Sequence, residues 1–353
     1  MKKRIIPAFL CFFLMAVLPL ISAKNGIALS ENEAAATLSA ESSDVEKTKP
    51  QNNNKSSGNK EVSVTDDGDD RKFRIFNTSD GKIITVDDRE FCYGALAYEM
   101  PPTFEEEALK AQVVALYTHF CRLRNIQKEN PDKDLKGADF SADLSEGQFY
   151  LSDKQLRSKW GELYYESIKK IRSAVDSVFG KVLTDEKGEL IDACYHAISS
   201  GTTENAKDIF GSDDEHLIAV PSPTDINAPD YITKLSFSAD EFKEKMSSLS
   251  KDVKLTGKPE SYISETKRTP SGSVTEITIG GIEFTGSDIR QTFGLRSAAF
   301  EIEYSDKKFS FTVRGYGHGV GLSQWGAKGM AEQGSGYEEI LKHYYQNIKI
   351  KDT

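Results

Sequence analysis

One carboxylate, Glu99, has surroundings that suit acid–base chemistry, within "YEMPPTFEEEALKAQVVALY", residues 98–117. The Met-Pro-Pro run after it favours extended backbone, because a residue that precedes proline avoids helical angles. Thr103 and Glu106 then match the T-x-x-E pattern of a capping box, which starts a helix. We therefore expect Glu99 to lie on an extended segment just outside a rigid helix, as a candidate general acid. A solvated loop carboxylate is the alternative.

Two further segments combine polar side chains with small residues. "CYHAISSGTTENA" places His196 at the end of an expected strand and Ser200 in the loop behind it, although a turn whose histidine satisfies backbone groups fits equally. "GYGHGVGLSQWGAKGMA" has six glycines between 315 and 329, together with His318 and Gln324. It lacks the G-x-x-x-x-G-K-[ST] pattern of a phosphate loop. Its glycines predict close backbone approach to another chain segment or to a ligand, which is compatible with a glycan groove.

The elements that must position these residues follow from hydrophobic periodicity. Residues 104–124 carry an apolar stripe at helical spacing, and a second helix is expected from Asp153 to Phe179, stopped by Gly180. "FRIFNTSDGKIITVDD" and "KVLTDEKGELIDACYH" each predict a hairpin. The remainder predicts mainly strands, for example "VTEITIGGIEFTG" and "AFEIEYSDKKFSFTVRGYG", before a terminal helix in "YEEILKHYYQN". The fold class is therefore α+β, a single mixed domain with helices early and a β-rich remainder.

Composition divides the 353-residue chain into three parts. Residues 1–23 contain a basic start and a 19-residue uncharged, mostly apolar run, which predicts a membrane anchor with the chain that follows outside the cytoplasm. Its small-residue end also resembles a signal-peptide cleavage site; we favour an uncleaved anchor. Residues 24–71 lack aromatic residues and predict a disordered linker. Residues 72–353 form the folded domain.

Charge and cysteine usage limit the remaining function classes. The net charge of −10 argues against nucleic acid as a partner. Outside the predicted anchor, Cys92, Cys121 and Cys194 are odd in number and have no metal or disulfide spacing, so three buried thiols are expected. A zinc hydrolase built from Cys194, His196 and His318 fits no ligand-spacing pattern. No cofactor and no metal are predicted.

Five sequence blocks, in this order, resemble the stage II sporulation protein D family: "EMPPTFEEEALKAQVVA", "CYHAISSGTTENAKDIFG", "HLIAVPSPTD", "TGSDIRQTFGLRSAAFEI" and "GYGHGVGLSQWGAKGMAEQGSGYEEILKHYY". The resemblance implies a lytic transglycosylase that cleaves peptidoglycan strands stripped of stem peptides during engulfment of the forespore. It implies work beside stage II sporulation proteins P and M, on the mother-cell side of the engulfing septum. The family's catalytic Glu falls on Glu99.

This reaction explains why one carboxylate is enough. Most glycosidases need two, whereas a lytic transglycosylase uses the 6-hydroxyl of the muramic acid itself and leaves a 1,6-anhydro end. The same Glu can protonate the leaving oxygen and then accept the hydroxyl proton. Glu99 must then stay protonated near neutral pH, so its pKa is expected to be raised by a partly desolvated site.

The resemblance also implies substrate contacts, with departures from the family pattern. Lys110 matches a lysine of the first block, although an ion pair with Glu106 is the alternative. Tyr117 stands where the family usually has arginine, so a cation is missing from a helix face expected to point toward substrate. Ser200 replaces the first Gly of the family's "H-S-x-S-G-G" block. The expected substrate-binding residues are Lys110, Tyr117, His196, Ser200, His318 and Gln324.

Two alternatives bear on this expectation. The family also includes amidase enhancers, so a noncatalytic wall-binding protein that stimulates a partner amidase is the competing function. Some members carry zinc in a segment that reads "G-A-D-x-C-T-D-S-x-H-C-Q-x-Y". Here residues 137–150 read "GADFSADLSEGQFY", with Ser141, Glu146 and Gly147 in place of the ligands. Packing by Phe140 and its apolar neighbours is expected to hold this segment instead.

Overall fold

The computed structural model describes residues 71–353, so the predicted anchor and nearly all of the predicted linker lie outside the described residues. Within this range no helix is both long and apolar enough to cross a membrane. The α-helices are α2 (Asp88–Glu99), α3 (Glu106–Glu129), α4 (Asp153–Trp160), α5 (Tyr164–Val178), α6 (Ala206–Phe210), α7 (Ala239–Leu249), α8 (Gly286–Phe293), α9 (Gln324–Glu332) and α10 (Tyr337–Tyr344).

Thirteen strands and four short 3-10 helices complete the described part of the chain. The strands are β1 (Lys72–Asn77), β2 (Lys82–Asp87), β3 (Phe140–Ala142), β4 (Lys181–Thr184), β5 (Tyr195–His196), β6 (Ile232–Ser238), β7 (Ile263–Arg268), β8 (Val274–Ile279), β9 (Ile282–Thr285), β10 (Phe300–Ser305), β11 (Lys308–Arg314), β12 (Leu322–Ser323) and β13 (Lys349–Asp352). The 3-10 helices are η2 (Lys133–Leu135), η3 (Gly161–Leu163), η4 (Pro223–Asn227) and η5 (Pro259–Ser261).

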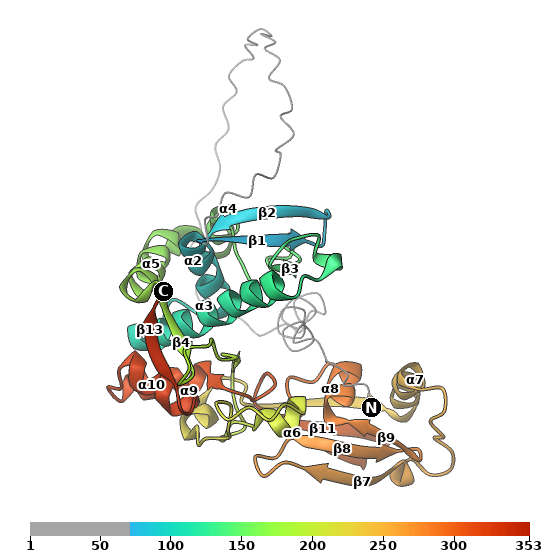
Figure 1. Cartoon of the computed structure of the whole chain (residues 1–353). Coiled ribbons are helices and arrows are strands. Elements are labelled where there is room, and N and C mark those ends of the chain that lie inside the picture. The colour runs from blue at the N-terminus through green and yellow to red at the C-terminus, as the bar shows by residue number, and fades with distance from the viewer. Residues whose placement is uncertain (1–70) are drawn as a thin grey trace, which may run out of the picture.

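Figure 1 shows two lobes, each with a hydrophobic core of its own. We call residues 232–314 the β lobe and the rest of the described chain the main lobe. In the main lobe, α3 packs against α2, α5, α9 and α10, and the sheet β2-β1-β3 covers one side. In the β lobe, the sheets β10-β11-β6 and β7-β8-β9 carry α7 and α8. Both lobes combine helices with strands, so the described chain as a whole is a mixed helix-and-strand structure.

The α3 stripe and the first hairpin confirm the periodicity analysis. Leu109, Val113, Leu116 and Phe120 are buried in the main core. β1 and β2 pair antiparallel around a turn at Gly81, whose φ is +72°. The predicted capping box is wrong, because Glu105 precedes α3 and no side chain caps it.

Two other predicted elements differ from the structure. The helix expected from 153 to 179 is interrupted at Gly161 (φ +51°), which separates α4 from α5. The second predicted hairpin forms its turn, where Asp185 and Glu189 hydrogen-bond, and its arms pair only through an isolated antiparallel bridge between Thr184 and Leu190. The longer pairing of β4 is with β13, and β5 pairs in parallel with β12, so partners distant in the chain supply most of the pairing of these two strands.

Candidate active site

Glu99 is the last residue of α2, a helix that the sequence analysis missed in favour of an extended segment. Asp87 starts α2 by accepting hydrogen bonds from the backbone amides of Arg89 and Glu90. Met100 ends it with extended angles (φ −128°, ψ 143°), as its position before Pro101 requires. The prolines therefore stop the helix directly after Glu99, which fixes this carboxylate at a helix end.

Two side chains from the far part of the main lobe hold the carboxylate of Glu99. The Tyr195 hydroxyl on β5 donates to Oε1 at 3.1 Å, and Nε2 of Gln324 donates to Oε2 at 3.4 Å. Tyr195 is fully buried and Gln324 is 5% exposed, whereas Glu99 itself is half-buried. Two buried donors thus hold the carboxylate in place, while part of the Glu99 residue stays accessible to solvent.

Burial raises the pKa of Glu99 to about 7, against the hydrogen bonds from Tyr195 and Gln324 and the charge of Lys159, which lower it. The expectation of a raised pKa is therefore confirmed, with desolvation as the main cause. Near neutral pH this group exists in both forms. It can give up a proton and take one back, which is what combined acid and base catalysis by a single group requires.

Lys159 joins α4 to the end of α2. Its Nζ donates to the carbonyl of Ala97 at 2.9 Å. This carbonyl belongs to the last turn of α2, where carbonyls lack helical partners and favour a cation. Lys159 therefore caps the helix that carries Glu99 and places a positive charge beside it.

The glycine-rich segment positions Gln324 and Tyr195 by lying directly on the chain around residue 195. A side chain at Gly321 would meet the Cys194 carbonyl at 2.1 Å, and one at Gly315 would meet the Ile198 carbonyl at 2.7 Å. Both glycines also have positive φ, which disfavours other residues. The predicted close approach is thus to another chain segment, and it brings β12 beside β5.

A buried carboxylate fixes the start of α9, from which Gln324 projects. Asp225 accepts a hydrogen bond from the Ser199 amide at 2.8 Å and from the Ser323 hydroxyl at 2.8 and 2.9 Å. Ser323 in turn caps α9 through the amide of Gly326. The main-lobe loops that surround Glu99 are thereby tied together through one side chain.

Aromatic and cationic side chains form the rim of the site. Tyr98 and Tyr316 are half-buried, and the charge of Glu99 contributes to the raised pKa of both hydroxyls after the larger effect of burial. The guanidinium of Arg296 lies over the Tyr316 ring at 4.4 Å. Neither Tyr316 nor Arg296 was predicted as a site residue, because no local sequence pattern relates residues so distant in the chain to Glu99.

His196 and His318 lie together, away from the carboxylate. Their rings are 5.7 Å apart, and Nδ1 of His196 contacts the Val320 carbonyl at 3.1 Å. Burial lowers the pKa of His196 to about 4 and that of His318 well below its usual value. Because neighbouring strand residues point to opposite faces, His196 points away from the face on which Tyr195 meets Glu99. Substrate contact by the two histidines stays a prediction.

Ser200 belongs to the seam between the lobes. Its hydroxyl donates to the Ser271 carbonyl of the β lobe at 2.7 Å, and Tyr231 donates to the Ser200 carbonyl at 2.8 Å. A small pocket beside it is lined by Ser200, Glu204 and His318 and does not include Glu99. The structure therefore gives Ser200 a role in joining the lobes, and its contact with substrate stays a prediction.

Lys110 and Tyr117 both lie on α3, and each contacts a different set of residues. Lys110 forms ion pairs with Glu107 at 2.8 Å and Glu106 at 3.1 Å, so the alternative pairing is present. Tyr117 is 4% exposed and donates to Asp88 at 3.0 Å. Asp88 begins α2 and Glu99 ends it, which separates them by roughly 16 Å. Tyr117 therefore faces the core in this structure, and its contact with substrate stays a prediction.

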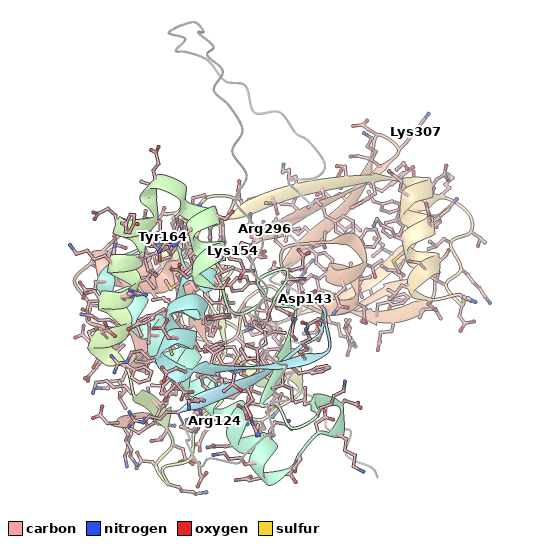
Figure 2. The ribbon with its side chains drawn as sticks, turned by 90° about the horizontal axis from the view of Figure 1, so that it is seen from above. Arg124, Asp143, Lys154, Tyr164, Arg296 and Lys307 are labelled. Carbon is pink, nitrogen blue, oxygen red and sulfur yellow. The ribbon has the colours of Figure 1, made fainter. Side chains whose placement is uncertain are left out.

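The family pattern has an arginine at position 117, and this chain instead has an arginine, Arg124, on the same helix. Nη1 of Arg124 donates to both carboxylate oxygens of Asp88 at 3.0 Å, and its guanidinium lies 4.6 Å from the Phe73 ring centre. Arg124 lies seven residues after Tyr117, on the same face of α3. Figure 2 labels it at the side of the main lobe remote from Arg296. This charge serves the packing of α2 on α3.

Residues 137–150 are held by pairing and packing. β3 pairs in parallel with β1, and the Leu144 amide donates to the Asn77 side chain at 3.1 Å. Phe140 is buried, and Leu144, Phe149 and Tyr150 pack against the main core, as expected. Among the described residues no group of three or more His, Cys, Asp or Glu side chains could hold a metal ion. Cys92, Cys121 and Cys194 are buried and form no disulfide.

Fold and site together describe a protein of mixed helices and strands in which one half-buried carboxylate, Glu99, lies at a helix end and has a raised pKa. Residues 77–184 match the SpoIID family, described as "Stage II sporulation protein". The chain is 38% identical over 279 residues to stage II sporulation protein D of Bacillus amyloliquefaciens, covering 79% of this chain and 78% of that protein. Identity to the Bacillus subtilis (strain 168) protein of that name is 37% over 282 residues, with the same coverage. The chain belongs to the stage II sporulation protein D family.

A more distant relative is relevant to the alternative that the protein enhances an amidase. The amidase enhancer of Bacillus subtilis (strain 168) is 25% identical over 309 residues, which is 73% of this chain and 40% of that protein. The chain thus spans less than half of this relative, and the likeness is weaker than that to the two sporulation proteins.

Proposed function

We propose that this protein is a peptidoglycan lytic transglycosylase that cleaves the bond between N-acetylmuramic acid and N-acetylglucosamine and leaves 1,6-anhydro ends. The observation that carries the proposal is the lone carboxylate of Glu99, with a pKa raised to about 7 and hydrogen bonds from Tyr195 and Gln324. Such a group suits a reaction in which one residue serves first as acid and then as base.

The proposed reaction consumes no water. Protonated Glu99 gives its proton to the glycosidic oxygen as the bond from that oxygen to C1 of the muramic acid breaks. The 6-hydroxyl of the same sugar then bonds to C1 and passes its proton to the carboxylate. Tyr195 and Gln324 stabilise the ionised form of Glu99 between the two steps, because both donate to it.

The proposed setting is the peptidoglycan of a sporulating cell, during engulfment of the forespore. The substrate is a glycan strand stripped of stem peptides, and the partners are stage II sporulation proteins P and M. The N-terminal anchor holds the catalytic part outside the membrane, on the mother-cell side of the septum. Family membership supports this setting.

A cleavage assay with purified glycan strands tests the proposed activity. We expect the full chain in mild detergent to shorten peptide-free strands, and Glu99→Gln to reduce the rate at least about 1,000-fold, because the isosteric amide cannot transfer the proton. Glu105→Gln is the matched control, since this half-buried carboxylate lies six residues away. Equal rates for wild type and Glu99→Gln would reject the proposal.

The competing function is enhancement of an amidase without cleavage, favoured by the likeness to a protein named amidase enhancer. The same preparation mixed with a peptidoglycan amidase separates the two functions. An enhancer leaves glycan strands intact and raises release of peptides, equally in wild type and in Glu99→Gln.

A further inference from the structure

Arg296 is a charged residue at the rim of the site, and the proposed reaction gives it no role. It follows α8 on the chain that leads into β10, and its side chain is 23% exposed. Figure 2 labels Arg296 where the β lobe meets the main lobe, whereas Lys307 lies at the outer tip of the β lobe. The β lobe thus places a permanent positive charge at its boundary with the main lobe.

The structure fixes both the backbone and the guanidinium of this residue. The Gly317 amide donates to the Arg296 carbonyl at 3.0 Å. The guanidinium lies 4.4 Å from the centre of the Tyr316 ring, a stacking arrangement that arginine favours. Tyr316 is in turn close enough to Glu99 for that charge to raise the pKa of its hydroxyl. The Tyr316 ring therefore connects the guanidinium to the surroundings of Glu99.

The guanidinium has hydrogen-bonding capacity left for a ligand. Its buried Nε finds no acceptor among residues 71–353. Nη1 lies 3.7 Å from the carboxylate of Asp230, whose side chain is 77% exposed, and an exposed pair of this kind contributes little stability. An arginine offers five donors arranged to bind a planar carboxylate with two parallel hydrogen bonds. The best-fitting ligand group is a carboxylate that approaches the rim.

The proposed substrate carries a carboxylate on its lactyl group, next to the sugar ring, only in one form. The carboxyl group of the lactyl side chain of muramic acid is a neutral amide while a stem peptide is attached, and it becomes a carboxylate when the peptide is removed. We propose that Arg296, held on Tyr316, binds this lactyl carboxylate and makes the site selective for peptide-free strands. The inference rests on the proposed function, because it takes the same glycan as ligand.

Binding measured without turnover tests the role of Arg296. The full chain carrying Glu99→Gln is titrated with peptide-free strands and with the same strands after their lactyl carboxyls are converted to methyl amides. We expect the carboxylate strands to bind about 10-fold or more tightly, as a charge-assisted pair provides. Adding Arg296→Gln should abolish this preference by weakening carboxylate binding alone, whereas Arg296→Lys should retain part of it.

Arg89→Gln is the matched control. Its guanidinium also lies 4.4 Å from a ring centre, that of Phe179, and it pairs with Asp176, but it stands at the opposite end of α2 from Glu99. This variant should keep the full preference. An Arg296→Gln variant that keeps the preference, or weakens both strands equally, would overturn the inference. Failure of the wild-type chain to cleave would overturn the proposed chemistry alone, because binding is read separately.

Discussion

At the scale of the residue, the pKa of Glu99 links its surroundings to the pH dependence of the reaction. The general acid is active when protonated, so the rate under substrate saturation should fall as pH rises through about 7. The Tyr195 hydroxyl donates to the ionised carboxylate and therefore lowers this pKa.

Tyr195→Phe should accordingly move the alkaline limb of the pH–rate profile upward by about 0.5 to 1 pH unit, since one hydrogen bond to the ionised form is lost. The measurement is the initial rate on peptide-free strands from pH 5 to 9. Tyr345→Phe is the control, because Tyr345 is equally buried and donates to the Cys194 carbonyl. A limb that stays in place, or moves downward, in Tyr195→Phe would contradict the assigned role of Glu99.

The sequence patterns singled out Glu99 but not the residues that contact it. Glu99 stood out because prolines follow it, and the structure shows that they end its helix. Tyr195 lies 96 residues away and Gln324 lies 225 residues away. Gln324 was named from its glycine-rich segment without its contact to Glu99. Tyr195 could have been found only as the neighbour of His196.

At the scale of the element, the buried pair between Asp88 and Arg124 holds α2 against α3. Asp88 is fully buried, and the Arg124 side chain is 10% exposed. Arg124→Met should lower the free energy of unfolding by about 3 kcal/mol, because it leaves a buried carboxylate without its cation. Chemical denaturation measures this change.

The exposed ion pair between Arg157 and Asp153 is the control for the buried pair. Its Nε and Oδ2 atoms are 2.7 Å apart. Arg157→Met should lower the free energy of unfolding far less than Arg124→Met, because an exposed ion pair contributes little stability. Equal losses in the two variants would show that the Asp88 pair does not anchor α2. The alkaline limb of the pH–rate profile should stay near 7 in both, since neither arginine contacts Glu99.

Two of the helices that the sequence analysis missed, α2 and α9, lack the amphipathic pattern on which it relied. Residues 91–97 of α2 are all buried, so no polar face marks a helical period. A side chain at Gly94 would meet the Leu151 carbonyl at 2.5 Å, which explains a glycine inside this helix. Gly326 and Gly329 likewise let α9 approach Ser222 and Thr224, and they made α9 resemble a loop.

At the scale of the whole molecule, strands that are distant in the chain join to build the site. β5 with β12 and β4 with β13 connect the middle of the chain to its end, and local patterns cannot predict such pairings. The division into two cores was also beyond sequence patterns, because strands of either lobe alternate in the same way. The predicted mixture of helices and strands is confirmed.

Stability of the whole protein should not depend on metal. β3, Asn77 and the main core hold residues 137–150, the segment in which some relatives bind zinc. We expect no stoichiometric zinc by elemental analysis, and neither the melting temperature nor the activity should change after treatment with a chelator. One zinc per chain, lost on replacing Cys194 or His196, would contradict this.

The central claim is that Glu99 cleaves glycan strands without water. The most direct test is mass spectrometry of products formed from peptide-free strands by the full chain, in water enriched in a heavy oxygen isotope. The account predicts muramic acid ends that are lighter by one water and carry no heavy oxygen, and that are absent with Glu99→Gln. Ordinary reducing ends that contain heavy oxygen would instead mean hydrolysis and would contradict the account.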